Sequence, residues 1–233
     1  MTTNYHGAAM TETDMRPIRT FHPRRGRMSA RHHDAYSALW PALGFTVVDG
    51  DRSDLDLTEL FGNGAPVVLE IGFGMGDATA EMAAQDPKRN YLAVEVHTPG
   101  IGNLLALAGE RNLTNLRIAH GDAMQLVHRI APGSLDAVHV YFPDPWPKAR
   151  HHKRRLIQPS NVALLRDRLR PGGVLHCATD WPDYAEAMAG TLDADPGLSL
   201  LPEAKNPRPT TKFERRGSEA GRPISDFLYA RSL

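Results

Sequence analysis

The chain has 233 residues, of which 41% are hydrophobic and 23% charged, a composition typical of one globular domain. No apolar run reaches the roughly 18 residues of a membrane-spanning helix. The first residues lack the basic and apolar pattern of a secretory signal, so we expect a cytoplasmic protein with no membrane partner. The single cysteine, Cys177, excludes an intramolecular disulfide and a cysteine-cluster zinc site.

Positive charge is concentrated in two segments, although the net charge of the chain is zero. Residues 16–33 and 148–155 together hold 11 of the 27 lysine and arginine residues and no acidic residue. Such patches favour local contact with a polyanion. We expect an irregular basic arm over residues 1–33 and a single domain over residues 34–233.

Strand and helix patterns alternate along the chain after a helical stretch at residues 34–43 and a strand-like stretch at 45–48. Strands are expected at residues 67–72, 90–96, 116–122, 135–142, 173–180, 198–204 and 224–232. Helices are expected at residues 77–85, 101–112, 123–130, 161–169 and 184–192, with Asp77 and Ser160 as N-caps and Gly172–Gly173 after the fourth. This alternation indicates an open, mostly parallel α/β sheet, in which ligands bind at the carboxyl ends of the strands.

The first of the alternating strands ends in the glycine-rich turn E-I-G-F-G-M-G, in which Gly72, Gly74 and Gly76 follow Glu70. Glycines let the backbone approach a ligand closely, and the N-terminus of the next helix favours an anionic group. A dinucleotide fingerprint would need glycine where Asp77 stands. The pattern looks like the first methyltransferase motif, and a turn without a ligand is the alternative.

The next two strands also end in acidic residues. Glu95 suits binding of ribose hydroxyls, in S-adenosylmethionine and NAD equally, or is a solvated acid at a strand end. Asp122, followed by Ala123, would lie near an adenine, or it caps the next helix.

The fourth strand runs into the loop Y-F-P-D-P-W-P-K, where three prolines surround Asp144. The loop resembles the D-P-P-Y/W loop of amino and ring-nitrogen methyltransferases. Asp144 would then bind the target base and a loop aromatic residue would stack on that base, whereas a turn in which Asp144 only caps a backbone N–H is the alternative. Asp180 ends the fifth strand, with capping of the next helix as its alternative.

A basic run directly follows this loop, and contacts from it to phosphates would hold RNA without reading its sequence. Its residues are Arg150, His151, His152, Lys153, Arg154 and Arg155. A solvated surface is the alternative. The two histidines lack a third ligand within local reach, so we expect no metal.

Several segments together resemble the bacterial tRNA (guanine-N7)-methyltransferases. The resemblance covers residues 67–217 and rests on LEIGFGMG (69–76), VEVH (94–97), GDA (121–123), FPDPWPKARHHKRRLIQP (142–159), ATDW (178–181) and TKFERRG (211–217). It implies a Rossmann-like class I methyltransferase fold with a mostly parallel sheet, helices on both faces and an antiparallel C-terminal strand pair. It also implies methyl transfer from S-adenosylmethionine to N7 of a guanosine in the tRNA variable loop.

The resemblance implies a role for each matching residue. S-adenosylmethionine would contact Glu70, Gly72, Gly74, Gly76, Glu95, Asp122, Ala123 and Asp144, and Asp144 would also be the active-site acid. The guanosine substrate would contact Lys148, Asp180, Thr211, Lys212, Phe213 and Glu214, while residues 150–155 would hold the tRNA. The chain departs from the family at Pro147, where histidine is frequent, and at residues 219–226.

The alternative function is a class I methyltransferase acting on another RNA or a non-RNA acceptor. It would share the cofactor site and differ in residues 148–155 and 211–217. A noncatalytic RNA-binding protein would have lost the cofactor acids, and an NAD-dependent oxidoreductase would need the third glycine of its fingerprint. We expect a monomer or a weak homodimer.

Overall fold

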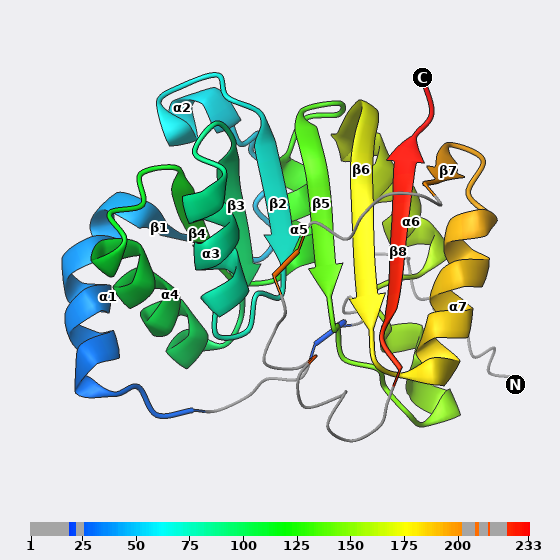
Figure 1. Ribbon diagram of the computed structural model, residues 1–233, viewed down its shortest axis with the longest axis horizontal. Helices are drawn as coiled ribbons and strands as arrows, with labels where there is room; N and C mark the ends of the chain where they lie inside the picture. The colour runs from blue at the N-terminus through cyan, green and yellow to red at the C-terminus, as the bar shows by residue number, and fades with distance from the viewer. Residues whose placement is uncertain (1–18, 22–25, 202–207, 210–213, 215–222) are drawn as a thin grey trace, which may run out of the picture.

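The predicted alternation of strands and helices builds one eight-stranded sheet with helices on both faces (Figure 1). The structure is a computed structural model that describes residues 19–21, 26–201, 208–209, 214 and 223–233. Its strands are β1 (Gly44–Thr46), β2 (Val67–Ile71), β3 (Asn90–Glu95), β4 (Leu116–His120), β5 (Leu135–Tyr141), β6 (Leu169–Thr179), β7 (Leu198–Leu200) and β8 (Ser225–Arg231). Its helices are α1 (Ala30–Leu43), α2 (Leu57–Phe61), α3 (Asp77–Gln85), α4 (Thr98–Glu110), α5 (Ala123–Arg129), the 3-10 helix η2 (Ala149–Arg154), α6 (Pro159–Arg168) and α7 (Pro182–Asp193).

The strand order, β1-β4-β3-β2-β5-β6-β8-β7, confirms the predicted fold class. Among the strand pairs that the structure describes, only β6–β8 and β7–β8 are antiparallel. The chain leaves β2 through β3 and β4 on one side and returns to its other side with β5. This reversal puts the topological switch point at the carboxyl end of β2, where α/β sheets bind their ligands.

The sheet is buried on both faces, which is why its central strands are almost continuously apolar. Leu69 and Ile71 of β2 pack into a cluster with α2, α5, α6 and α7, whereas Val68 packs into a second cluster with α1, α3 and α4. All five residues of β2 are buried, and the exception in chemistry is Glu70, a carboxylate in an otherwise apolar strand.

Polar side chains fill the part of the α3–α4 face that lies over β5, β6 and β8. The Tyr141 hydroxyl lies 3.0 Å from His176 Nδ1, and His176 Nε2 lies 2.9 Å from an Asp226 oxygen. Burial lowers the pKa of the neighbouring His139 to about 3, so its ring is neutral. On the opposite face of β6, the Cys177 thiol is fully buried, and burial raises its pKa.

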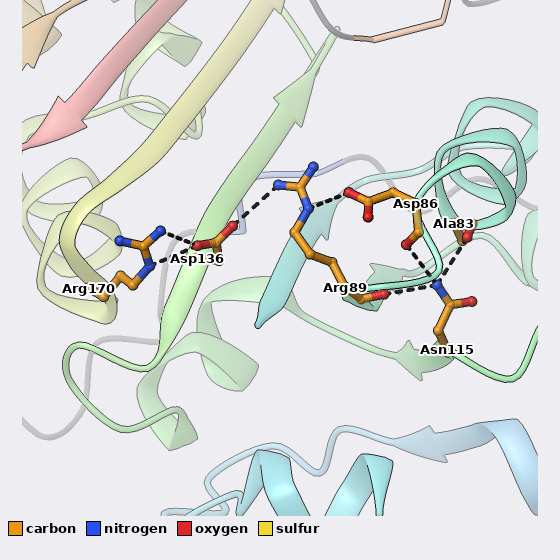
Figure 2. A network of polar contacts seen from close by, with 6 residues as sticks. All are labelled: Ala83, Asp86, Arg89, Asn115, Asp136 and Arg170. Atoms are coloured by element: carbon orange, nitrogen blue, oxygen red, sulfur yellow. Dashed lines mark hydrogen bonds and ion pairs between the residues drawn. The ribbon is translucent and has the colours of Figure 1, made fainter. Parts of the chain in front are cut away.

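A network of ion pairs and hydrogen bonds closes the amino edge of the sheet (Figure 2). Asp136, in β5, accepts hydrogen bonds from Arg170 on one oxygen and from Arg89 on the other. Arg89 also pairs with Asp86. The Asn115 side-chain N–H₂ contacts the carbonyl oxygens of Ala83, Asp86 and Arg89 at 2.9–3.3 Å. Every charge in this network meets a partner of the same chain.

Some predicted element ends are wrong. Helix α1 begins at Ala30, inside the predicted irregular arm, because the Ser29 hydroxyl accepts a hydrogen bond from the His32 N–H at 3.3 Å. Asp77 is the first helical residue of α3, whose N-cap is Gly76 in a left-handed conformation.

The other differences lie around β6 and β7. Ser160 is not an N-cap, because α6 already begins at Pro159, and proline is favoured in the first helical turn. Strand β6 starts at Leu169, directly after α6, so Gly172–Gly173 lie within the strand. Strand β7 ends at Leu200. None of the described helices is long and apolar enough to cross a membrane.

Candidate active site

The glycine-rich turn connects β2 to α3 at the switch point. Gly72, Gly74 and Gly76 have φ values of 75°, 61° and 77°, a left-handed conformation that glycine adopts without strain. Helix α4 presses against the turn, since a Cβ on Gly100 would lie 1.8 Å from the Gly74 carbonyl oxygen. Asn103 of α4 donates a 2.7 Å hydrogen bond to the Met75 carbonyl. The turn therefore has a fixed shape.

Glu95 joins the end of β3 to this turn. One of its oxygens accepts a 2.9 Å hydrogen bond from the Gly74 N–H. The other accepts from the N–H groups of Val96 and His97, at 2.7 Å and 3.0 Å. Three backbone donors thus fix the orientation of a carboxylate that lies directly beside the glycine turn.

Glu70 carries the most unusual environment among the predicted cofactor residues. Its side chain is buried, and its Oε2 has no hydrogen-bond partner among the residues that the structure describes. Burial raises the pKa of this carboxyl to about 7, and the nearby Glu95 carboxylate acts in the same direction. The side chain of Thr79 acts in the opposite direction and lowers this pKa. A buried carboxylate with one unpartnered oxygen is costly unless a ligand supplies a donor or a positive charge.

Asp122 caps helix α5 after β4, as its alternative interpretation predicts. One carboxylate oxygen accepts a 2.8 Å hydrogen bond from the Met124 N–H. Asp122 and Ala123 are only half-buried, so this cap lies at the surface of the same edge that carries Glu95. Their contact with a cofactor stays a prediction.

The loop after β5 has an unusual backbone. Among the described residues other than glycine, only Asn112, Phe142 and Trp146 have positive φ, and two of these flank Asp144. The Phe142 N–H donates to the Ala178 carbonyl of β6 at 2.8 Å, which ties the loop to the neighbouring strand. Left-handed conformations cost non-glycine residues of order 1–3 kcal/mol and cluster at functional sites.

The buried side chain of Trp146 anchors this loop. Its ring is buried, with 3% exposed, and its Nε1 donates a 3.2 Å hydrogen bond to the Thr20 carbonyl of the N-terminal segment. Arg154 covers the ring, with its Cζ 5.0 Å from the ring centroid. The expectation that a loop aromatic residue stacks on a target base therefore does not fit Trp146, because no ring face is open to a base.

The basic run divides into outward and inward members. Lys148, Arg150 and Lys153 are exposed, while His151, His152 and Arg154 are half-buried. Arg155 is buried, with only 3% of its side chain exposed, and its Nε donates to the Pro145 carbonyl at 2.9 Å. This placement does not match the predicted contact of Arg155 with RNA.

Asp180 is half-buried and follows β6 at the same edge. Trp181 is the N-cap of α7, so the capping alternative for Asp180 is wrong. Of the predicted late substrate element, Thr211, Lys212 and Phe213 lie outside the described residues, and Glu214 forms an ion pair with Arg208.

Arg208 links this late element to the strands. Its guanidinium donates two 2.9 Å hydrogen bonds to the Asp226 carboxylate of β8. Its Cζ also lies 5.5 Å and 5.3 Å from the ring centroids of Tyr141 and Phe142. Sequence reasoning missed Arg208, Asp226, Gly100 and Asn103, since no local spacing marks contacts between such distant residues.

The N-terminal segment touches the site at two places. Thr20 binds Trp146, as described, and Gly26 packs against the N-cap and first turn of α4. A Cβ on Gly26 would lie 2.7 Å from Pro99 and 2.8 Å from His97. Arg31, counted in the basic arm, instead contacts Asn103 and Glu110 of α4.

Comparisons with known proteins agree with this geometry. A family model described as a putative methyltransferase matches residues 64–227. The tRNA (guanine-N(7)-)-methyltransferase of Streptomyces avermitilis is 55% identical over 223 residues, which cover 93% of this chain and 76% of the relative. The protein of the same name from Halorhodospira halophila is 51% identical over 221 residues, covering 92% and 95%.

Solved structures share the fold at low sequence identity. The 16S rRNA methyltransferase KamB has a TM-score of 0.58 and 19% identity, over 78% of this chain and 95% of that chain. A mutant 16S rRNA (adenine(1408)-N(1))-methyltransferase from Catenulisporales acidiphilia, solved with its cosubstrate SAM, has a TM-score of 0.52 and 16% identity, over 78% and 93%. The chain thus has the Rossmann-like fold of class I methyltransferases.

Proposed function

The chain belongs to the tRNA (guanine-N(7)-)-methyltransferase family, and we propose that it transfers a methyl group from S-adenosylmethionine to N7 of a guanosine in the tRNA variable loop. One observation carries the proposal beyond the relatives. Four acidic residues lie at or after the carboxyl ends of four successive strands, β2 to β5, at one edge of the sheet: Glu70, Glu95, Asp122 and Asp144. We place the enzyme in the cytoplasm, as a monomer or weak homodimer.

The cofactor residues fit S-adenosylmethionine by the chemistry of their donors and acceptors. The unpartnered oxygen of Glu70 suits the ammonium group of the methionine part, beside backbone that glycine leaves open. The fixed carboxylate of Glu95 suits the ribose hydroxyls. Asp122 suits the exocyclic amine of the adenine. S-adenosylmethionine bound in this way supplies an electrophilic methyl group on a sulfonium.

The reaction needs positioning more than proton transfer. The N7 lone pair of guanine forms the new N–C bond while the S–C bond breaks and the sulfur keeps that electron pair. Because N7 carries no proton, no residue has to act as a general base. Holding N7 about 3–3.5 Å from the methyl carbon and in line with sulfur removes much of the barrier.

Asp144 is the residue that we assign to the developing charge. The methylated guanine ring is cationic, and a fixed carboxylate stabilises positive charge as it forms. The same carboxylate suits the N1–H and exocyclic amine donors of guanine. The two left-handed residues near Asp144 and the three prolines of the loop restrict the backbone that carries this carboxylate.

The exposed cations beside this loop account for RNA binding. Lys148, Arg150 and Lys153 extend from the Asp144 loop into η2 and are open to solvent. Phosphate contacts from them would position the tRNA without reading its sequence. The guanine would have to leave its stack to reach the edge of the sheet.

The experiment is incubation of the full chain with S-adenosylmethionine and unmodified bulk tRNA, followed by nucleoside mass spectrometry. We expect 7-methylguanosine, and nuclease mapping should place it in the variable loop. Modification of ribosomal RNA instead would establish the alternative acceptor. Absence of S-adenosylmethionine binding in calorimetry would overturn the assignment of Glu70 and the glycine turn.

A further inference from the structure

Arg155 belongs to the basic run, but it is the member whose side chain is buried. We infer that Arg155 is a positioning residue, which holds the loop of Asp144 in its reactive shape by binding the Pro145 carbonyl. This inference rests on the proposed function, because it gives Asp144 a role in the transfer. It assigns to Arg155 a task other than contact with RNA.

Four groups surround the Arg155 guanidinium. Its Nε donates to the Pro145 carbonyl at 2.9 Å, and its Nη2 lies 3.1 Å from His152 Nε2. The same Nη2 forms an ion pair with Asp183 at the start of α7. Its Cζ lies 4.7 Å from the ring centroid of Tyr184, whose side chain is fully buried. The guanidinium therefore bridges the Asp144 loop and helix α7.

The loop needs such an anchor because of its prolines. Pro143, Pro145 and Pro147 have no backbone N–H, so alternate residues of the loop cannot donate a backbone hydrogen bond. The ring fixes φ of Pro145 but leaves the orientation of its carbonyl open. Arg155 fixes that carbonyl, and with it the peptide between Pro145 and Trp146, one residue after Asp144.

The location of the charge supports a structural task. Burying a cation is costly unless it is paired and hydrogen-bonded. A cation that binds the phosphates of RNA has to be accessible to the docking polyanion. Asp183 compensates this charge from the surface, with 59% of its side chain exposed. Lys153, two residues earlier in the same run, is exposed. Position in the run therefore does not determine the role of each cation.

The test compares Arg155→Lys and Asp183→Asn with Lys153→Ala, and Lys88→Ala at the opposite edge of the sheet serves as the surface-charge control. Arg155→Lys keeps the charge but loses the planar fork of donors. We expect kcat for tRNA methylation to fall about 10- to 100-fold, since small displacements of a reacting group have effects of this size. KM for tRNA and the salt dependence of tRNA binding should stay as in the wild type.

Lys153→Ala should show the opposite pattern, with weaker tRNA binding. Its tRNA affinity should fall, and the slope of log K against log salt should become smaller by about 0.7–0.9, as expected for one lost phosphate contact. Arg155→Ala removes the charge and tests the RNA-binding alternative. If Arg155→Ala reduces this slope as Lys153→Ala does, and Arg155→Lys leaves kcat unchanged, Arg155 binds RNA and the inference is wrong.

Hydrogen exchange gives a readout that does not need activity. The amides of Asp144, Trp146 and Lys148 should exchange faster in Arg155→Lys and in Asp183→Asn, and at the wild-type rate in Lys88→Ala. Unchanged exchange in both variants would overturn the inference, even if the wild type makes no 7-methylguanosine. Where Arg155→Lys does not fold in a thermal melt, Asp183→Asn carries the test, because it removes the partner at the surface.

Discussion

The amino and carboxyl edges of the sheet are both rich in charged residues, but they differ in whether those charges have hydrogen-bond partners. At the amino edge, Asp136 is shared between Arg89 and Arg170, and the contacts of Asn115 close the loop before β3 (Figure 2). At the carboxyl edge, Glu70 is buried and its own Oε2 has no hydrogen-bond partner among the described residues, and Phe142 and Trp146 near Asp144 have left-handed backbone. Satisfied charges indicate a structural role, and an unsatisfied buried charge indicates a ligand.

Cavity volume does not identify the reactive edge of the sheet, whereas the hydrogen bonding of its polar groups does. A hollow of about 630 Å³ lies at the amino edge, near Asn90, Asn115 and Arg117. The side-chain N–H groups of these residues already donate to Asn63, to loop carbonyls and to the Leu60 carbonyl. The hollow therefore offers few free polar groups, and its volume alone does not make it the reactive site.

The largest expected effect is at Asp144. Asp144→Ala should lower the rate of single-turnover methylation about 100-fold or more, because it removes the charge that stabilises the cationic product ring. Filter binding should find tRNA affinity within about threefold of wild type, since phosphate contacts dominate it. A rate within a few-fold of wild type would show that Asp144 only orients its ligands.

A matched pair of substitutions sets the two edges against each other. Glu70→Gln should weaken S-adenosylmethionine binding about 10- to 100-fold, the loss of one charged hydrogen bond, without lowering the thermal stability of the free protein. Asp136→Asn should do the reverse and remove about 1–3 kcal/mol of stability while leaving cofactor affinity unchanged. Calorimetry measures the cofactor affinity and denaturant unfolding measures the stability. If both variants changed the same quantity, the difference in role between the two edges would be wrong.

Two glycines provide the next comparison. Gly100→Ala should destabilise the protein by about 1–3 kcal/mol and weaken cofactor binding, because the new methyl group meets the Gly74 carbonyl. Gly190→Ala in α7, where a Cβ meets nothing within 4 Å, should stabilise it by about 0.5–1 kcal/mol. Urea unfolding curves of both variants check the sign, and a neutral Gly100→Ala would mean that α4 can move away from the turn.

The last expected effect is in the pH dependence of cofactor binding. With the pKa of Glu70 raised to about 7, the ionised carboxylate becomes populated as the pH rises through that value. S-adenosylmethionine affinity should therefore rise about tenfold from pH 6 to pH 8, after correction by the profile of Glu70→Gln. Without ligand the sign is opposite, since the folded state holds this proton more tightly. Stability of the wild type should fall from pH 4.5 to pH 7 relative to Glu70→Gln.

The elements and the acids at the strand ends were predictable, because both follow from local patterns. Strands buried on both faces are continuous apolar runs, and Glu70 and Glu95 stand where such runs stop. The roles of Arg155 and Trp146 were not predictable, because a basic run and a proline-rich loop look the same whether a member turns inward or outward. The pair of Arg208 and Asp226 joins residues 18 positions apart, outside any helical or strand period.

The exact first residues of two helices could not be predicted from the sequence either. Asp77 and Ser160 are residue types that cap helices, but Gly76 and Pro159 next to them decide where α3 and α6 begin. Glycine adopts the left-handed conformation without strain, so Gly76 can occupy the N-cap position of α3. The preference of the neighbouring Asp77 side chain for that position does not outweigh this.

The buried position of Cys177 has a practical consequence for labelling. It is the sole cysteine of the chain, it is fully buried, and burial raises its pKa, so it holds little of the reactive thiolate at neutral pH. A cysteine introduced at an exposed position, such as Lys88, would therefore react selectively with a maleimide dye in the otherwise unaltered chain. Energy transfer from that dye to a labelled tRNA would then report docking as it happens.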